Sequence, residues 1–244
     1  MSIADKLTTV AENVPKVYEA GKKSKYDAFW DTYQRNGLRR DYSYAFYGRG
    51  WNKDTFKPKY PIFFEKTSNE ENPTWARMFE NFALTVEYMP EKVDFSNIEI
   101  DFSAITDADS LFKNASVMNL YCDFSNVTTI YYCFGSPNRG RIDNLTLKVS
   151  EKCTNFNYAF YYQNITTLIF EDGSVIAANG LNLTWATSLT KESIVSIINA
   201  LSATTSGLTV TLSKTAVTNA FGGVDSAEWQ ALIATKSNWT ISLV

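Results

Sequence analysis

The sequence predicts an α/β fold in which a right-handed solenoid with a parallel sheet follows an N-terminal helical segment. A short phrase that ends in phenylalanine recurs along the chain, and a strand pattern follows it three times. Phe134 lies 22 residues after Phe112, and Asp123 lies 22 residues after Asp101 within a second recurring phrase. A period of this length is too short for an ordinary strand-helix-strand crossover and fits one coil of a solenoid.

Composition limits the classes of function. The chain has 244 residues, of which 45% are hydrophobic, and it contains no histidine. That absence excludes Ser-His and Cys-His dyads and imidazole ligands to metals. Cys122, Cys133 and Cys153 fall inside apolar patterns without CxxC spacing, which predicts small, reduced core residues. We therefore expect a non-enzymatic protein with no cofactor and no metal.

Charge and hydropathy limit the partners. The formal net charge of −3 requires no strongly basic face, so we expect no nucleic acid partner. The apolar runs are shorter than the roughly 18–20 residues that span a bilayer, and residues 1–6 contain no apolar signal-peptide core. These features predict a protein made in the cytoplasm, without membrane insertion.

Residues 1–37 are predicted to form a helical segment for anchoring or oligomerisation. Ser2 and Asp5 resemble a capping box, and Pro15 marks a kink or the start of a second helix. An apolar seam with alternating spacings of four and three follows the cap: Ile3, Leu7, Val10, Val14 and Val17. The seam fits either a helix packed on its own domain or one that self-associates. We expect a homo-oligomer.

Residues 38–104 are predicted to form atypical, aromatic-rich first repeats, because Phe46 and Phe79 are 33 residues apart. The recurring phrase is a hexamer that begins with Asp, Thr or Asn. It occurs at Asp41–Phe46, Thr74–Phe79, Asp107–Phe112, Thr129–Phe134 and Asn155–Phe160. Its first residue can cap a helical turn, and its apolar positions share one face. Each hexamer therefore predicts a capped short helix that buries its phenylalanine.

Residues 105–244 are predicted to form the regular solenoid with helix-strand caps at its C-terminal end. Strands are expected at 120–122, 145–147, 168–170, 181–185, 208–212 and 239–243. Thr190 is expected to cap a helix that carries apolar residues at helical spacing, and Asp225 with Glu228 predicts a capping box for a second helix.

Two resemblances extend these expectations. The Ala-Phe pair of Asn155–Phe160, followed by the strand pattern of Thr167–Phe170, resembles the BspA-like class of bacterial leucine-rich repeats. The segment Leu181–Ser193 looks like the final leucine-rich unit of such proteins. This resemblance covers residues 105–244 and implies a solenoid of the leucine-rich-repeat type. The opening, Ser2–Gly21 with Tyr26–Asp31, resembles the start of tail-associated proteins encoded in Firmicutes phages and prophages, which implies a location in the virion.

The expected function is that of a virion structural protein of the tail, baseplate or fibre. Its N-terminal helix would bind itself or other virion proteins. Its repeat surface would bind a host-surface glycan, a host protein or a neighbouring virion subunit, since solenoids offer extended rigid surfaces. The alternatives are a bacterial surface adhesin and a tail-borne glycan depolymerase. The depolymerase would need carboxylates about 5–10 Å apart.

Tyrosines provide the candidate contact surface. The position two residues before each phenylalanine is polar-tipped, so Tyr132 and Tyr158 are expected to face outward and stack in adjacent coils. Tyr131, Tyr161 and Tyr162 lie nearby in the sequence. Exposed tyrosines are typical of contact surfaces because they supply area at low entropic cost. The alternative is that they only cover the flank of the coil.

Overall fold

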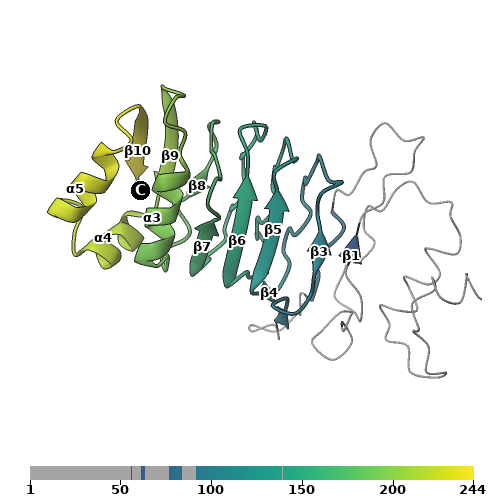
Figure 1. Ribbon diagram of the computed structural model, residues 1–244. Coiled ribbons are helices and arrows are strands. Elements are labelled where there is room, and N and C mark those ends of the chain that lie inside the picture. The colour runs from purple at the N-terminus through teal and green to yellow at the C-terminus, as the bar shows by residue number, and fades with distance from the viewer. Residues whose placement is uncertain (1–55, 57–61, 64–76, 84–91, 139) are drawn as a thin grey trace, which may run out of the picture.

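The computed structural model describes residue 56 and residues 62–63, 77–83, 92–138 and 140–244. Within these residues the chain forms a solenoid whose strands all pair in parallel. The strands are β1 (Ile62–Phe63), β2 (Val93–Asp94), β3 (Ile100–Asp101), β4 (Val117–Met118), β5 (Leu120–Phe124), β6 (Asn144–Val149), β7 (Thr167–Phe170), β8 (Asn182–Leu183), β9 (Leu208–Leu212) and β10 (Trp239–Leu243). Figure 1 shows strands of successive coils side by side along the molecule, with the helices at the C-terminal end.

The strands pair as β1-β3, β2-β4, β5-β6-β7 and β8-β9-β10. In the central sheet Leu145 of β6 lies opposite Leu120 of β5 and Leu168 of β7. The alternation of buried and less buried residues along β5 and β6 is the pattern expected where one strand face packs on a core. The strand predictions are confirmed, although β8 is shorter than the predicted span 181–185.

The hexamers within the described residues do not form helices. Residues 77–83, 108–115, 130–136 and 156–163 form turns that stack coil upon coil, here called the turn column. In the first three of these turns the N–H groups of alternate residues donate to carbonyls of the following coil, as from Ser110 to Tyr131 at 2.9 Å and from Phe112 to Cys133 at 2.9 Å. The intervening N–H groups close turns within the coil, as from Lys113 to Ser110 at 3.1 Å. Every second N–H group of these turns is therefore bonded to a neighbouring coil. The continuous series of i to i−4 bonds that defines an α-helix cannot form.

The first residue nevertheless caps its turn in the three hexamers that the structure describes in full. Asp107 Oδ1 accepts from the N–H of Asp109 at 2.8 Å, and Asn155 Oδ1 accepts from the N–H of Asn157 at 3.1 Å. These are Asx turns, which satisfy a donor two residues ahead without a helix. The capping role was predicted correctly and the helix was not.

Within the described residues the phenylalanines that end the hexamers form a buried ladder, as predicted for Phe112, Phe134 and Phe160. The ring centroids of Phe112 and Phe134 are 6.1 Å apart, and those of Phe134 and Phe160 are 5.4 Å apart. Phe79 extends the stack at 4.9 Å from Phe112. All four side chains are buried. One phenylalanine per coil therefore builds a continuous aromatic core along the solenoid axis.

The C-terminal end contains three helices, α3 (Lys191–Ala200), α4 (Lys214–Phe221) and α5 (Ala227–Ala234). Thr190 caps α3 as predicted, by accepting from the N–H of Ser193. Helix α5 is capped by Ser226, not by the predicted pair Asp225 and Glu228. Helix α4 was not predicted; Ser213 caps its start, and Gly222, in the left-handed region with φ of 74°, ends it.

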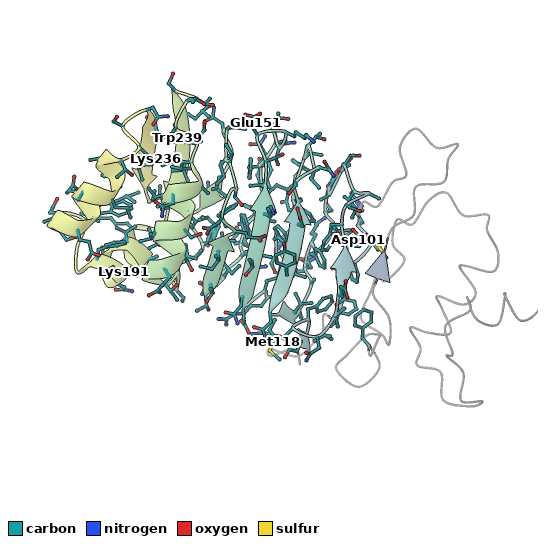
Figure 2. All side chains as sticks on the ribbon, in the orientation of Figure 1. Asp101, Met118, Glu151, Lys191, Lys236 and Trp239 are labelled. Atoms are coloured by element: carbon teal, nitrogen blue, oxygen red, sulfur yellow. The ribbon has the colours of Figure 1, made fainter. Side chains whose placement is uncertain are left out.

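Side chains of the last unit bond to carbonyls at the end of α3 and just after it. Lys236 Nζ donates to the carbonyl oxygens of Asn199 and Leu201, and Trp239 Nε1 donates to the Ser202 carbonyl at 2.9 Å. Figure 2 shows Lys236 and Trp239 close together at this end of the solenoid. The bonds from Lys236 and Trp239 satisfy carbonyls at the helix end that lack an intrahelical partner. Burial lowers the pKa of Lys236.

Candidate functional site

Six aromatic side chains gather on the flank of the turn column. We call them the aromatic surface: Tyr131, Tyr132, Tyr158, Tyr161, Tyr162 and Trp185. The Tyr132 and Tyr158 rings are stacked, with centroids 5.2 Å apart. The Tyr161 and Tyr162 centroids are 4.3 Å apart, and Tyr162 reaches Trp185 at 4.3 Å. The rings therefore form one contiguous patch.

The five tyrosines selected from the sequence are thus brought together, although they are not equally exposed. Tyr158 is 51% exposed, Tyr162 is 46% exposed, and Tyr131 is also exposed. Tyr132 and Tyr161 are half-buried. The predicted outward direction therefore holds fully for Tyr158 and only partly for Tyr132.

Three of these tyrosines have an unusual backbone conformation. Tyr132, Tyr158 and Tyr162 have φ of 54°, 57° and 57°. The same region is occupied by Ser110 and by Arg77, the residues two positions before the earlier phenylalanines. A left-handed conformation favours glycine or asparagine, and for other L-residues it costs about 1–2 kcal/mol. The turn column imposes the conformation, and tyrosine occupies it despite the cost.

Tyr132 of the aromatic surface carries a hydroxyl donor, and the cation of Lys113 lies beside its ring. Burial, followed by the neighbouring phenols of Tyr131 and Tyr158, raises the pKa of Tyr132. This phenol therefore stays protonated and can donate a hydrogen bond. Lys113 Nζ lies 5.2 Å from the centroid of the Tyr132 ring, within cation-π range.

A groove adjoins the aromatic surface on the side of β8 and β9, with a volume of about 660 Å³. Tyr158, Tyr161 and Trp185 belong to both. The rest of the lining consists of amide or hydroxyl side chains together with one glycine and one leucine: Asn157, Asn179, Asn182, Thr184, Thr209, Thr211, Gly180 and Leu181. Along β9, Thr209 and Thr211 alternate with the buried Val210 and Leu212, so β9 turns its threonines outward.

Gly180 keeps the groove open. Its φ is +99°, which most side chains avoid, and a Cβ added to it would lie 2.6 Å from Asn157 Oδ1. Both the backbone conformation and the available space therefore require glycine at this position. A larger residue would displace the amide of Asn157, which lines the groove.

Sequence reasoning missed Trp185 and the asparagines of the groove. Trp185 was assigned to a strand that in fact ends at Leu183, so its exposure was not anticipated. Asn157 and Asn182 come from different coils, and only the register between coils brings them to one groove. The available signal was the alternation of Leu181, Asn182 and Leu183, which places the asparagine on the strand face opposite the two leucines.

The three cysteines lie in surroundings that indicate a role in core packing. Cys122, Cys133 and Cys153 are buried as free thiols in the core, as predicted. Burial raises the pKa of Cys122 and Cys133, and it raises that of Cys153 to about 12, so these thiols stay protonated. Asp107 and Asp109 are carboxylates of the kind that the depolymerase alternative would need, and both bond within their own turn. Asp107 Oδ1 accepts from the Asp109 N–H, and Asp109 Oδ1 accepts from Ser110 Oγ at 2.7 Å.

Within the described ranges, no group of three or more acidic or cysteine side chains is arranged to hold a metal ion. The helices of the same ranges are all too short or too polar to cross a membrane. The predicted assembly seam, Ile3, Leu7, Val10, Val14 and Val17, lies outside the described residues, as does most of 38–104.

Comparison with protein families, curated proteins and solved structures finds no match to this chain.

Proposed function

We propose that this chain is a non-enzymatic binding protein whose aromatic surface recognises a glycan on a host cell. The exposed rings supply flat apolar faces that stack against the CH faces of sugars. Phenol hydroxyls at their edges can bond to sugar hydroxyls. The solenoid holds the rings on stacked turns, so little side-chain entropy is lost when a ligand binds.

The observation that carries this proposal is the backbone of the exposed tyrosines. Tyr158 and Tyr162 occupy left-handed positions, and their exposed rings contribute little to the core. Asparagine would fit the same backbone at lower cost. Backbone strain of this kind concentrates at binding and active sites, where it is retained for what the side chain does. A tyrosine kept at such a position is therefore better explained by contact with a ligand than by stability.

The double variant Tyr158→Asn with Tyr162→Asn tests the proposal. We expect a free energy of unfolding equal to that of the wild type or higher, because asparagine relieves left-handed strain. Glycan binding should weaken at least tenfold, or about 1.4 kcal/mol. The measurements are urea denaturation and binding of the labelled chain to an array of bacterial and eukaryotic surface glycans.

Tyr121→Asn is the matched control. Tyr121 is 46% exposed, like Tyr162, but it lies on β5 outside the aromatic surface and donates to Glu171 Oε2 at 2.8 Å. Its replacement should leave glycan binding unchanged. The proposal is wrong if no glycan binds the wild type above the level of the double variant. It is also wrong if the double variant loses stability and keeps its binding, because the tyrosines would then be structural.

We also propose that the solenoid is of the right-handed leucine-rich-repeat type and acts in a phage particle. The repeat type is supported by the Leu-x-hydrophobic strands, which place Leu120, Leu145 and Leu168 in register. The virion location is supported by the resemblance of residues 1–31 to tail-associated proteins. In that setting the aromatic surface would contact the host and the N-terminal segment would contact other virion proteins.

Assembly through the N-terminal seam is testable in the full chain. The variant Leu7→Glu with Val14→Glu places two charges on the predicted apolar seam. We expect the chain to change from an oligomer to a monomer in sedimentation, because unpaired charges in an apolar contact are costly. The melting temperature should not change. Thr8→Glu, beside the seam, is the control. If the melting temperature falls instead, the seam packs on the chain's own core.

A further inference from the structure

The groove beside the aromatic surface presents fixed hydrogen-bond donors. Asn179 Oδ1 accepts from the N–H of Thr209 at 2.8 Å. Asn182 Oδ1 accepts from the N–H and the hydroxyl of Thr184 at 3.0 and 2.6 Å. Because the protein occupies and orients each amide oxygen, the amide nitrogen of the same side chain is the atom left to donate to a ligand.

The turn column adds main-chain donors at the same place. In the preceding coil, the N–H of Tyr132 donates to the Asn157 carbonyl at 3.2 Å, and that of Phe134 donates to the Ala159 carbonyl at 2.9 Å. Tyr158 and Phe160 occupy the same positions in the last coil of the column. No acceptor in the described ranges pairs with their N–H groups. Of these two residues Tyr158 lines the groove, so its N–H is the main-chain donor that the last coil offers there.

A groove that offers uncharged hydrogen-bond donors favours a particular chemical class of ligand. The lining contains no Lys, Arg, Asp or Glu side chain, so a carboxylate or ammonium group would be desolvated there without a countercharge. The volume of about 660 Å³ lies within the range of small-molecule sites, roughly 300–1,000 Å³. Tyr158 and Trp185 add aromatic faces at its rim. The complementary molecule is neutral, rich in acceptor oxygens and has apolar faces.

We propose that the groove binds one end of a neutral oligosaccharide, an inference that rests on the proposed function. Trp185 stacks on a sugar face. The amide groups of Asn179 and Asn182 and the N–H of Tyr158 donate to its hydroxyl and ring oxygens. The rest of the saccharide then extends over Tyr162 and Tyr158 along the aromatic surface.

The test is calorimetric titration of the full chain with gluco-, galacto- and manno-hexasaccharides and with their C6-carboxylate counterparts. We expect at least one neutral hexasaccharide to bind, and its carboxylated counterpart to bind at least tenfold more weakly. Asn182→Asp keeps the oxygen that accepts from Thr184 and replaces the donor with a charged acceptor. This variant and Trp185→Ala should each raise the Kd for the neutral sugar at least tenfold, and Trp185→Phe should stay within about threefold of the wild type.

The outcomes separate the two proposals. If a neutral sugar binds and depends on Tyr158 and Tyr162, but Asn182→Asp and Trp185→Ala leave the Kd unchanged, the groove inference is overturned and the proposed function stands. Tighter binding of the carboxylated sugars also overturns the groove inference. If no hexasaccharide binds while glycans on the array bind through the tyrosines, the groove is again excluded. Absence of binding in both experiments overturns the proposed function itself.

Discussion

Phe134→Ala should lower the free energy of unfolding by about 3–5 kcal/mol, the usual range for truncating a buried aromatic. Phe134 is fully buried and stacks against rings on both sides, at 6.1 Å from Phe112 and 5.4 Å from Phe160. Alanine would leave a cavity between two coils that the main-chain bonds on either side hold at fixed spacing. Neither coil can then move in to fill it.

Urea denaturation followed by circular dichroism measures this change. Phe134→Leu is the control, because it keeps most of the side-chain volume and should cost less than about 1.5 kcal/mol. A loss below about 1 kcal/mol for the alanine variant would show that the ladder does not support the solenoid.

Gly140→Ala should destabilise the protein by about 3 kcal/mol, at the upper end of the range for overpacking. A Cβ added at Gly140 would lie 2.1 Å from the carbonyl oxygen of Asn114 and 2.2 Å from its carbonyl carbon. The obstructing atoms are main chain, so no side-chain rotation can relieve the contact. The two coils would have to separate, which would weaken the bond from the N–H of Asn138 to Asn114 Oδ1, now 2.9 Å.

Gly173→Ala separates this steric effect from backbone strain. Gly173 has a φ of +84° and open space around its missing side chain. Alanine there meets only the left-handed penalty, about 1–2 kcal/mol. Thermal unfolding of both variants gives the comparison. If Gly140→Ala costs no more than Gly173→Ala, the coils are not packed as tightly as the structure shows.

The strands and the phenylalanine ladder could be predicted because they depend on side-chain pattern. Alternating apolar residues such as Leu145 and Leu147 bury one strand face, and the recurrence of phenylalanine indicated which rings would stack. These signals need no knowledge of the neighbouring coil. Their spacing in the sequence alone specified one strand and one buried ring per repeat.

The turn conformation could not be predicted, because it depends on bonds between coils. Nothing in the sequence around Tyr132 or Tyr158 indicates a positive φ, since tyrosine rarely adopts it. The hexamers carry the capping residue and apolar face of a helical turn, so a helix was the local expectation. The main-chain bonds between neighbouring coils determined the outcome.

The candidate site was predictable only in part. The tyrosines could be grouped because they occupy equivalent positions in consecutive repeats. The groove could not be predicted, because Asn157 and Trp185 belong to different coils and do not occupy equivalent positions of the repeat. Helix α4 was missed because Ser213 follows β9 directly, so the helix begins without an intervening loop.

The one-way bonding of the turn column makes the solenoid modular. Each inner coil of the column accepts bonds from the coil before it and donates the same kind of bond to the coil after it, as Thr129 accepts from Ala108 and Ile130 donates to Asn155. A duplicated coil would therefore meet compatible partners on both sides without any change at the two ends. Gene duplication of one such unit would lengthen the exposed flank by one further row of side chains. Recombination within the repeats could thus vary the reach of the surface in whole steps while the core stays the same.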